Sequence, residues 1–127
     1  MNLSELEQHV FAYYLTNGAQ ELNMVGRYWP YAELIMVIAD KVRVANRKFG
    51  MKATAASDTV AKAYLDLLIE REAYSTTKNK FGGSMHQFQP DVYARVYKDL
   101  MATNPIVQKA QAEGPDFWDK AFAALTA

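Results

Sequence analysis

Apolar residues recur every three or four positions along several stretches of the chain, the spacing that one face of an α-helix requires. The first stretch opens with Ser4 followed three residues later by Glu7, which is the form of a capping box. Gly18, directly after Asn17, is a typical residue for the end of a helix. The pattern therefore predicts a first helix over residues 3–17.

Two further helices are predicted in the middle of the chain. Pro30 suits the first turn of a helix, and Gly50 is expected to end that helix or the turn after it. The next helix is expected to begin at a cap formed by Thr54 or Ser57 and to run to about Glu72. The residues expected to face the core are Tyr31, Leu34, Ile35, Ile38 and Val42 in the earlier helix and Val60, Ala61, Tyr64, Leu65, Leu67 and Leu68 in the later one.

β-Structure is predicted where the helical spacing is lost. Two short runs of β-forming residues flank the turn-rich segment 79–83, which predicts a β-hairpin over residues 73–89. Residues 19–29 have no clear period, so Met24-Val25 and Tyr28-Trp29 are compatible with either a short strand or a packed loop.

Helical spacing returns after the hairpin. Pro90 and Asp91 are expected to start a fourth helix, and the breaks at Asn104-Pro105 and Gly114-Pro115 divide the remaining residues into further helices. The chain is therefore expected to be mainly α-helical with a small β-hairpin, and terminal helices at 3–17 and 91–126 flank the middle.

Composition places the chain among globular proteins of one domain. It has 127 residues, half of them hydrophobic and 22% charged, which is enough for one core over residues 1–127. There is no apolar run long enough for a membrane span and no signal-peptide pattern at the start of the sequence. There are also no cysteines. These features fit a cytoplasmic protein that does not enter a membrane.

A net charge of zero conceals an uneven distribution of charge. Residues 41–80 contain nine basic and four acidic side chains, whereas the rest of the chain contains five basic and ten acidic ones. The middle segment therefore has a net charge of +5 and the remainder −5. A basic face of this kind would attract an anionic partner, and the alternative is chance clustering on a solvated surface.

The join between the third helix and the hairpin carries a resemblance to a known fold. The segment from Tyr64 to Tyr74 resembles the join between recognition helix and wing in bacterial winged-helix regulators of the MarR and PadR kind, in which a Leu-x-x-Leu step precedes a charged turn and an apolar residue. The resemblance covers residues 31–90. Those families usually have glycine just before the wing strand, where this chain has Glu72-Ala73.

The resemblance implies a winged helix-turn-helix core that binds double-stranded DNA as a transcriptional regulator. Its recognition helix would lie at about 57–72 and its wing at about 73–89, with basic residues outside both elements adding phosphate contacts. Asp58 would repel phosphate unless it pairs with Lys62 or accepts a hydrogen bond from cytosine. The expected DNA-binding residues are Arg43, Arg47, Lys48, Lys52, Thr54, Ser57, Thr59, Lys62, Lys78, Asn79 and Lys80.

Regulators of this kind often dimerise through their terminal helices, so a homodimer is expected. The apolar stripe of the last helix would form the dimer interface, but it is equally suited to packing on the chain's own core. This stripe comprises Phe117, Trp118, Phe122 and Leu125.

No motif for catalysis or for binding a metal or cofactor is present. His9 and His86 are the only histidines and lie far apart, without other nitrogen or sulfur ligands nearby. The sequence has no nucleophile elbow, P-loop or Rossmann glycine pattern. We therefore expect a protein that is not an enzyme and that needs no metal or cofactor.

Two other functions fit the same sequence. Neutral charge and sixteen aromatic residues would also suit a non-enzymatic module that binds a protein partner, such as an adaptor, immunity or mobile-element protein. A ligand-sensing protein is the other alternative, with an apolar pocket lined by Tyr13, Tyr14, Tyr28, Trp29 and Tyr31.

Overall fold

The computed structural model describes residues 2–19, 26–47 and 54–126. These residues are mainly helical with a small antiparallel sheet, which confirms this part of the predicted fold class. In chain order the elements are α1 (Glu5–Asn17), β1 (Tyr28–Pro30), α2 (Tyr31–Asn46), α3 (Thr54–Glu70), β2 (Tyr74–Lys78), β3 (Ser84–Phe88), α4 (Pro90–Thr103), α5 (Pro105–Glu113) and α6 (Phe117–Thr126).

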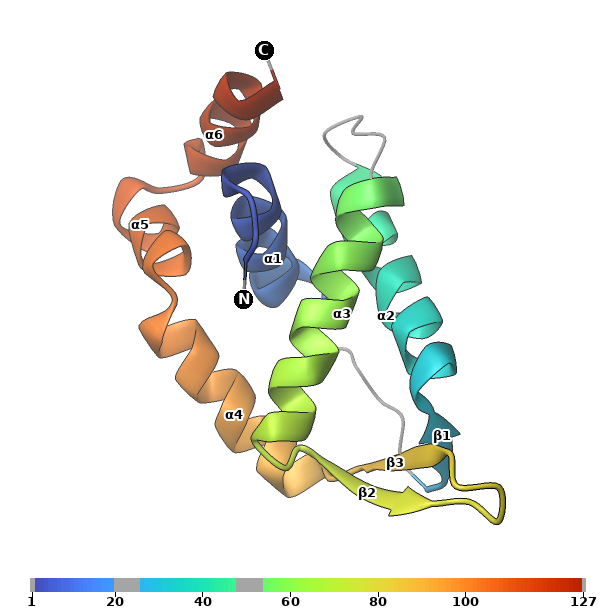
Figure 1. Ribbon diagram of the computed structural model, residues 1–127. Helices are drawn as coiled ribbons and strands as arrows, with labels where there is room; N and C mark the ends of the chain where they lie inside the picture. The colour runs from blue at the N-terminus through green and yellow to red at the C-terminus, as the bar shows by residue number, and fades with distance from the viewer. Residues whose placement is uncertain (1, 20–25, 48–53, 127) are drawn as a thin grey trace.

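Helix α1 lies at the centre of the helical part (Figure 1). Helices α2 and α3 pack together on one side of it, and α4, α5 and α6 run along the other side. Because α1 is enclosed in this way, every residue from Val10 to Leu15 is buried. Tyr14 of α1 and Tyr64 of α3 are fully buried where the two helices meet, with their rings edge to face at 5.5 Å.

The sheet lies at one end of α2 and α3 and has the strand order β1-β3-β2 (Figure 1). Strand β3 is central, and its His86 pairs with Trp29 of β1 and with Thr76 of β2. Side chains alternate between the two faces of a strand, so Tyr74, His86 and Phe88 are buried while Ser75, Met85 and Gln87 within the strands are more exposed. The predicted hairpin is therefore present.

Strand β1 settles one of the alternatives left open by the sequence. Tyr28-Trp29 forms a strand rather than a packed loop, because β3 supplies the backbone partners. Met24-Val25 lies outside the described residues. Three residues without a period give no strand signal on their own, and their pairing depends on a segment far along the chain.

The predicted capping box at the start of α1 is present. The Ser4 Oγ accepts a hydrogen bond from the Glu7 backbone N–H at 3.1 Å, and the Glu7 carboxylate accepts one from the Ser4 N–H at 2.8 Å. This second bond is the main reason that the pKa of Glu7 lies below its usual value. The first helix therefore begins where local sequence signals place it.

One of the two predicted helix boundaries in the middle of the chain needs correction, and the other is only partly described. Helix α2 ends at Asn46, and Gly50 lies outside the described residues. Helix α3 begins at Thr54, so Ser57 is inside the first turn and does not cap it. Ser57 is fully buried, a position that apolar spacing alone does not predict.

Helix α3 ends at Glu70, two residues before the predicted end, in a Schellman motif. The Ala73 N–H donates to the Leu68 carbonyl at 2.8 Å, and the Glu72 N–H donates to the Ile69 carbonyl at 3.1 Å. Glu72 has a φ of 64°, the left-handed conformation that glycine adopts most easily. The chain thus makes the usual turn into the first strand of the hairpin with a glutamate in the glycine position.

Candidate nucleic-acid interface

The loop of the β2–β3 hairpin is held in one shape by Asn79. Its side-chain oxygen accepts hydrogen bonds from the backbone N–H groups of Phe81 and Gly83, both at 2.9 Å. The backbone closes the same loop, because the Asn79 N–H donates to the Gly83 carbonyl at 2.8 Å. Gly82 has a φ of 82°, which suits glycine. Asn79 therefore orders the loop, in addition to its predicted role as a DNA contact.

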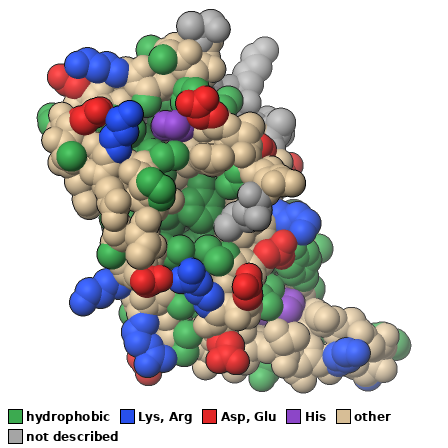
Figure 2. Space-filling model, turned by 60° about the vertical axis from the view of Figure 1, so that its left-hand side comes forward, with side chains coloured by type: hydrophobic (Ala, Val, Ile, Leu, Met, Phe, Trp, Pro, Cys, Tyr) green, Lys and Arg blue, Asp and Glu red, His purple; other side chains and the backbone are tan. Residues whose placement is uncertain are grey.

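The end of the hairpin projects from the body of the protein and carries basic side chains (Figures 1 and 2). Lys78 and Lys80 are exposed and form no ion pair with a carboxylate in the described part of the chain. The Lys80 ammonium lies 5.0 Å from the ring centroid of Phe81. The predicted wing residues are thus gathered at one accessible, positively charged tip.

The exposed stripe of α3 is mainly acidic, unlike the basic hairpin tip. Asp58, Lys62, Asp66 and Glu70 follow one another at intervals of four residues and are all exposed. Lys62 donates to Asp66 at 2.9 Å, and the Tyr31 hydroxyl donates to the same carboxylate. The hydrogen bond to Asp66 raises the pKa of Lys62. Three acidic groups and one engaged lysine give this stripe little attraction for phosphate.

Arg43 of α2 is also engaged by carboxylates. It forms an ion pair with Asp40, and its guanidinium lies 3.6 Å from Asp58. Of the two arrangements considered for Asp58, the pairing with Lys62, four residues along the same helix, is not the one formed, because Lys62 pairs with Asp66 instead. Arg43 takes its place from the neighbouring helix.

The other predicted contacts differ in accessibility. Arg47 and Thr59 are exposed, whereas Ser57 is buried and its hydroxyl has no hydrogen-bond partner among the described residues. The side chain of Thr54 and all of Lys48 and Lys52 lie outside the described residues. Ser57 is therefore not placed to touch DNA without a change in this part of the fold.

Apart from Lys62 in the middle of α3, the predicted DNA-binding residues with accessible, described side chains form two groups rather than one. Arg43, Arg47 and Thr59 lie where α2 ends and α3 begins, while Lys78, Asn79 and Lys80 lie beyond the other end of α3 (Figure 1). Helix α3 has 17 residues, which corresponds to a length of about 26 Å at 1.5 Å per residue.

The apolar stripe of α6 packs on α1 of the same chain. Phe122 is 2% exposed and meets the Tyr13 ring edge to face at 5.9 Å, and Phe117 stacks on His9 at 6.4 Å. Trp118 and Leu125 are partly exposed. Trp118 also meets the Tyr13 ring edge to face at 5.2 Å. Packing on the core is therefore observed for three of the four residues, and the homodimer stays a prediction.

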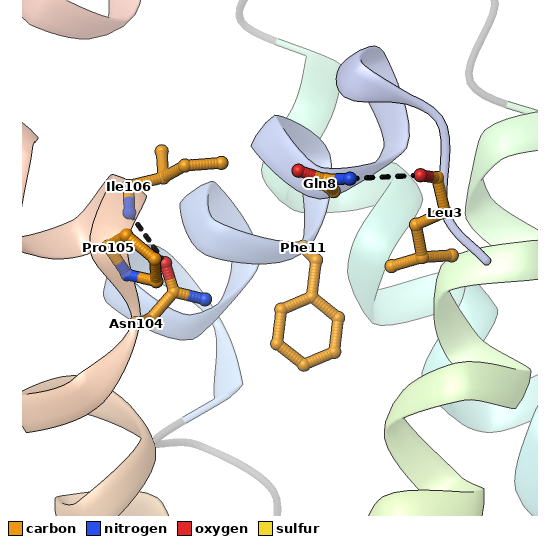
Figure 3. A pocket seen from close by; sticks show the side chains of 6 residues that line it. All are labelled: Leu3, Gln8, Phe11, Asn104, Pro105 and Ile106. Atoms are coloured by element: carbon orange, nitrogen blue, oxygen red, sulfur yellow. Dashed lines mark hydrogen bonds between the residues drawn. The ribbon is translucent and has the colours of Figure 1, made fainter. Parts of the chain in front are cut away.

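A cavity of about 250 Å³ lies between α1 and the α4–α5 junction (Figure 3). Phe11 points into it, and its polar wall consists of Gln8, which donates to the Leu3 carbonyl at 3.0 Å, and Asn104, which caps α5. The aromatic residues of the predicted ligand pocket do not line this cavity, and Tyr13 and Tyr14 are buried in the core.

The two histidines contact neighbouring side chains of the fold. His86 is 4% exposed, its Nδ1 lies 3.1 Å from the Thr76 hydroxyl, and burial lowers its pKa. His9 lies beside the α6 aromatic rings. Among the described residues, no three histidine or acidic side chains come together in a group that could hold a metal ion, and no described helix is long and apolar enough to cross a membrane.

Two features of the site were missed by sequence reasoning. Phe81 lies in the turn-rich loop, where an aromatic residue beside two glycines was the available signal. Tyr31 was assigned to the core stripe of its helix, but its hydroxyl reaches Asp66, 35 residues away. No sequence spacing links these two residues, because the contact arises from the packing of α2 on α3.

Comparison with known proteins gives no relative: no known family, curated protein or solved structure matches this chain.

Proposed function

We propose that the protein is a non-enzymatic, winged-helix protein of transcriptional-regulator type that binds double-stranded DNA with its β2–β3 hairpin. The order of elements supports a winged-helix core: a helix, a short strand, two packed helices and a hairpin whose second strand pairs with the short strand. In this arrangement α3 is the counterpart of the recognition helix and the hairpin is the wing.

The observation that carries the proposal is the hairpin tip. Lys78 and Lys80 are exposed and pair with no carboxylate among the described residues. The Asn79 side chain holds the loop in one shape through its hydrogen bonds with Phe81 and Gly83. Cations on a projecting, ordered loop suit the phosphates beside a groove of duplex DNA. Lys62 and Arg43 are already held by carboxylates, so the hairpin rather than α3 supplies the main attraction.

The test is fluorescence anisotropy with duplex DNA over a series of salt concentrations. Each phosphate neutralised on duplex DNA contributes about −0.9 to the slope of log K against log salt, so Lys78→Gln/Lys80→Gln should make the slope shallower by about 1.8. The matched control is Lys98→Gln/Lys109→Gln, which removes the same charge from exposed positions of α4 and α5.

The two double variants distinguish a DNA contact made by the hairpin tip from a general effect of the protein's charge on binding. The proposal expects the control pair to leave the slope within error of the unchanged protein. Equal slopes for both pairs would show that the hairpin is not the contact, and an absence of binding at low salt would exclude DNA as the partner.

A second candidate is a module that binds a protein partner. Met36 is 67% exposed and Val44 is 61% exposed, and their spacing of eight residues places them on one face of α2. Exposed apolar side chains at helical spacing are typical of a helix-mediated contact. Met36→Asp/Val44→Asp should abolish partner binding in this case, while leaving any DNA binding by the hairpin intact.

A further inference from the structure

Phe81 at the hairpin tip is the most exposed large hydrophobic side chain in the described part of the chain, with 84% of its surface accessible. Its exposure does not follow from a disordered loop. The Asn79 side chain receives the Phe81 backbone N–H at 2.9 Å, and the Gly82 N–H donates to the Asn79 carbonyl at 3.0 Å. The fold thus presents an aromatic ring to solvent on a fixed backbone.

The charge around the ring is entirely basic within the hairpin. Residues 73–89 contain two lysines, Lys78 and Lys80, and no aspartate or glutamate. Lys80 lies 5.0 Å from the ring centroid of Phe81. A planar apolar ring with cations one and three residues before it complements a nucleic-acid base with its adjoining phosphates.

We propose that Phe81 stacks on a base that lies outside the double-helical stack, so that the hairpin prefers DNA with an unpaired position over fully paired duplex. This inference rests on the proposed function and adds to it the form of DNA recognised. Stacking on an aromatic ring does not depend on base identity, because every base has a π-face.

The small size of the tip is the reason to expect a preference for an unpaired base. An apolar wedge that enters an intact duplex must first separate two stacked base pairs, and other protein–DNA contacts must offset that free energy. Here one ring and two lysines supply the contact. A base that is already unpaired removes most of the unstacking free energy, so the same contacts give tighter binding.

A lipid surface is a poorer fit to the same observations. Stable attachment to a membrane needs a larger apolar area or several anchoring groups. At this tip the ring of Phe81 stands alone, since its neighbours in the loop are Asn79, Lys80, Gly82 and Gly83.

The experiment compares two DNA probes of the same length, one fully paired and one with a short central bubble that contains 2-aminopurine. The full chain should bind the bubble about tenfold more tightly than the paired duplex, in line with the contribution of one stacked base. Binding should also quench the 2-aminopurine fluorescence, which reports stacking directly.

Variants at the same position separate the ring from apolar bulk. Phe81→Leu should bind both probes equally, with the salt slope unchanged because both lysines remain, whereas Phe81→Trp should keep the preference and the quenching. The exposed position predicts unchanged thermal unfolding for both variants, which circular dichroism checks.

The outcomes distinguish this inference from the proposed function. Salt-dependent binding that requires Lys78 and Lys80 but shows no bubble preference would overturn the stacking role alone. Retention of the preference by Phe81→Leu would do the same. An absence of binding to either probe would overturn both proposals, and ring-dependent binding to vesicles containing phosphatidylserine would then assign the tip to a lipid surface.

Discussion

Tyrosine hydroxyls connect α3 and α4 with each other and with the end of α1 through hydrogen bonds. The Tyr93 hydroxyl donates to the Ala19 carbonyl and accepts from the Tyr64 hydroxyl at 3.0 Å. The Tyr97 hydroxyl donates to the Leu15 carbonyl at 2.6 Å. Burial raises the pKa of Tyr93 to about 12 and that of Tyr64 well above its usual value. These shifts favour the neutral hydroxyls that the hydrogen bonds require.

Tyr93→Phe should lower the free energy of unfolding by about 1–3 kcal/mol, the usual effect of leaving buried polar groups without a partner. Both the Tyr64 hydroxyl and the Ala19 carbonyl lose a hydrogen bond in this variant. Tyr97→Phe is the control, because its partly exposed position lets water replace the lost bond. Urea unfolding measures both, and an equal effect for the two variants would contradict the buried network.

His86 makes the stability depend on pH. Burial lowers the pKa of His86 in the folded state. In the unfolded chain its pKa is about 6.5, so the unfolded chain binds the proton more readily. Stability is therefore present above about pH 6.5 and falls as the pH drops below that value. Between about pH 7.5 and about pH 5.5, the free energy of unfolding should fall less in His86→Asn than in the unchanged protein. Asparagine keeps a hydrogen-bonding group beside Thr76 but does not titrate. Equal losses would place the titration elsewhere.

At the scale of elements, the sequence predicts what depends on local spacing and misses what depends on distant partners. The helices and the hairpin follow from apolar periodicity and from signals such as Ser4 and Glu7. Strand β1 forms only because β3 pairs with it, and Ser57 is buried at a position that no apolar spacing marks. The same limit applies to the site: the lysines at the tip were predicted, whereas the carboxylates that engage Arg43 were not.

Glu72 offers a test of the turn that joins α3 to the hairpin. Glu72→Gly should raise the free energy of unfolding by about 0.5–1 kcal/mol, because glycine adopts a positive φ without the steric penalty of a Cβ atom. Glu72→Ala is the control, since it removes the charge and keeps the Cβ. A gain in thermal stability for alanine equal to that for glycine would show that charge rather than backbone conformation decides the effect.

At the scale of the whole molecule, the helices after the hairpin return to cover α1. Helix α6 contributes Phe122 to an aromatic cluster with His9, Tyr13 and Trp118. The cluster links the two ends of the chain, so the N-terminal helix is stabilised by residues more than a hundred positions away. Its partly exposed members, Trp118 and Leu125, are the part of the stripe still accessible to a second copy of the chain.

Phe122→Ala should therefore lower the free energy of unfolding by about 3–5 kcal/mol, the usual effect of truncating a buried phenylalanine. The loss should be the same at every protein concentration, because the contacts lie within one chain. Leu125→Ala, on the same helix but partly exposed, should lower it by only about 1 kcal/mol. Thermal unfolding over a range of concentrations tests this directly, since dimer formation raises the midpoint as concentration increases. If the midpoint of the unchanged protein rises with concentration and that of Leu125→Ala does not, the exposed edge of the stripe forms the predicted homodimer. A constant midpoint in both proteins would mean that α6 packs only on the core of its own chain.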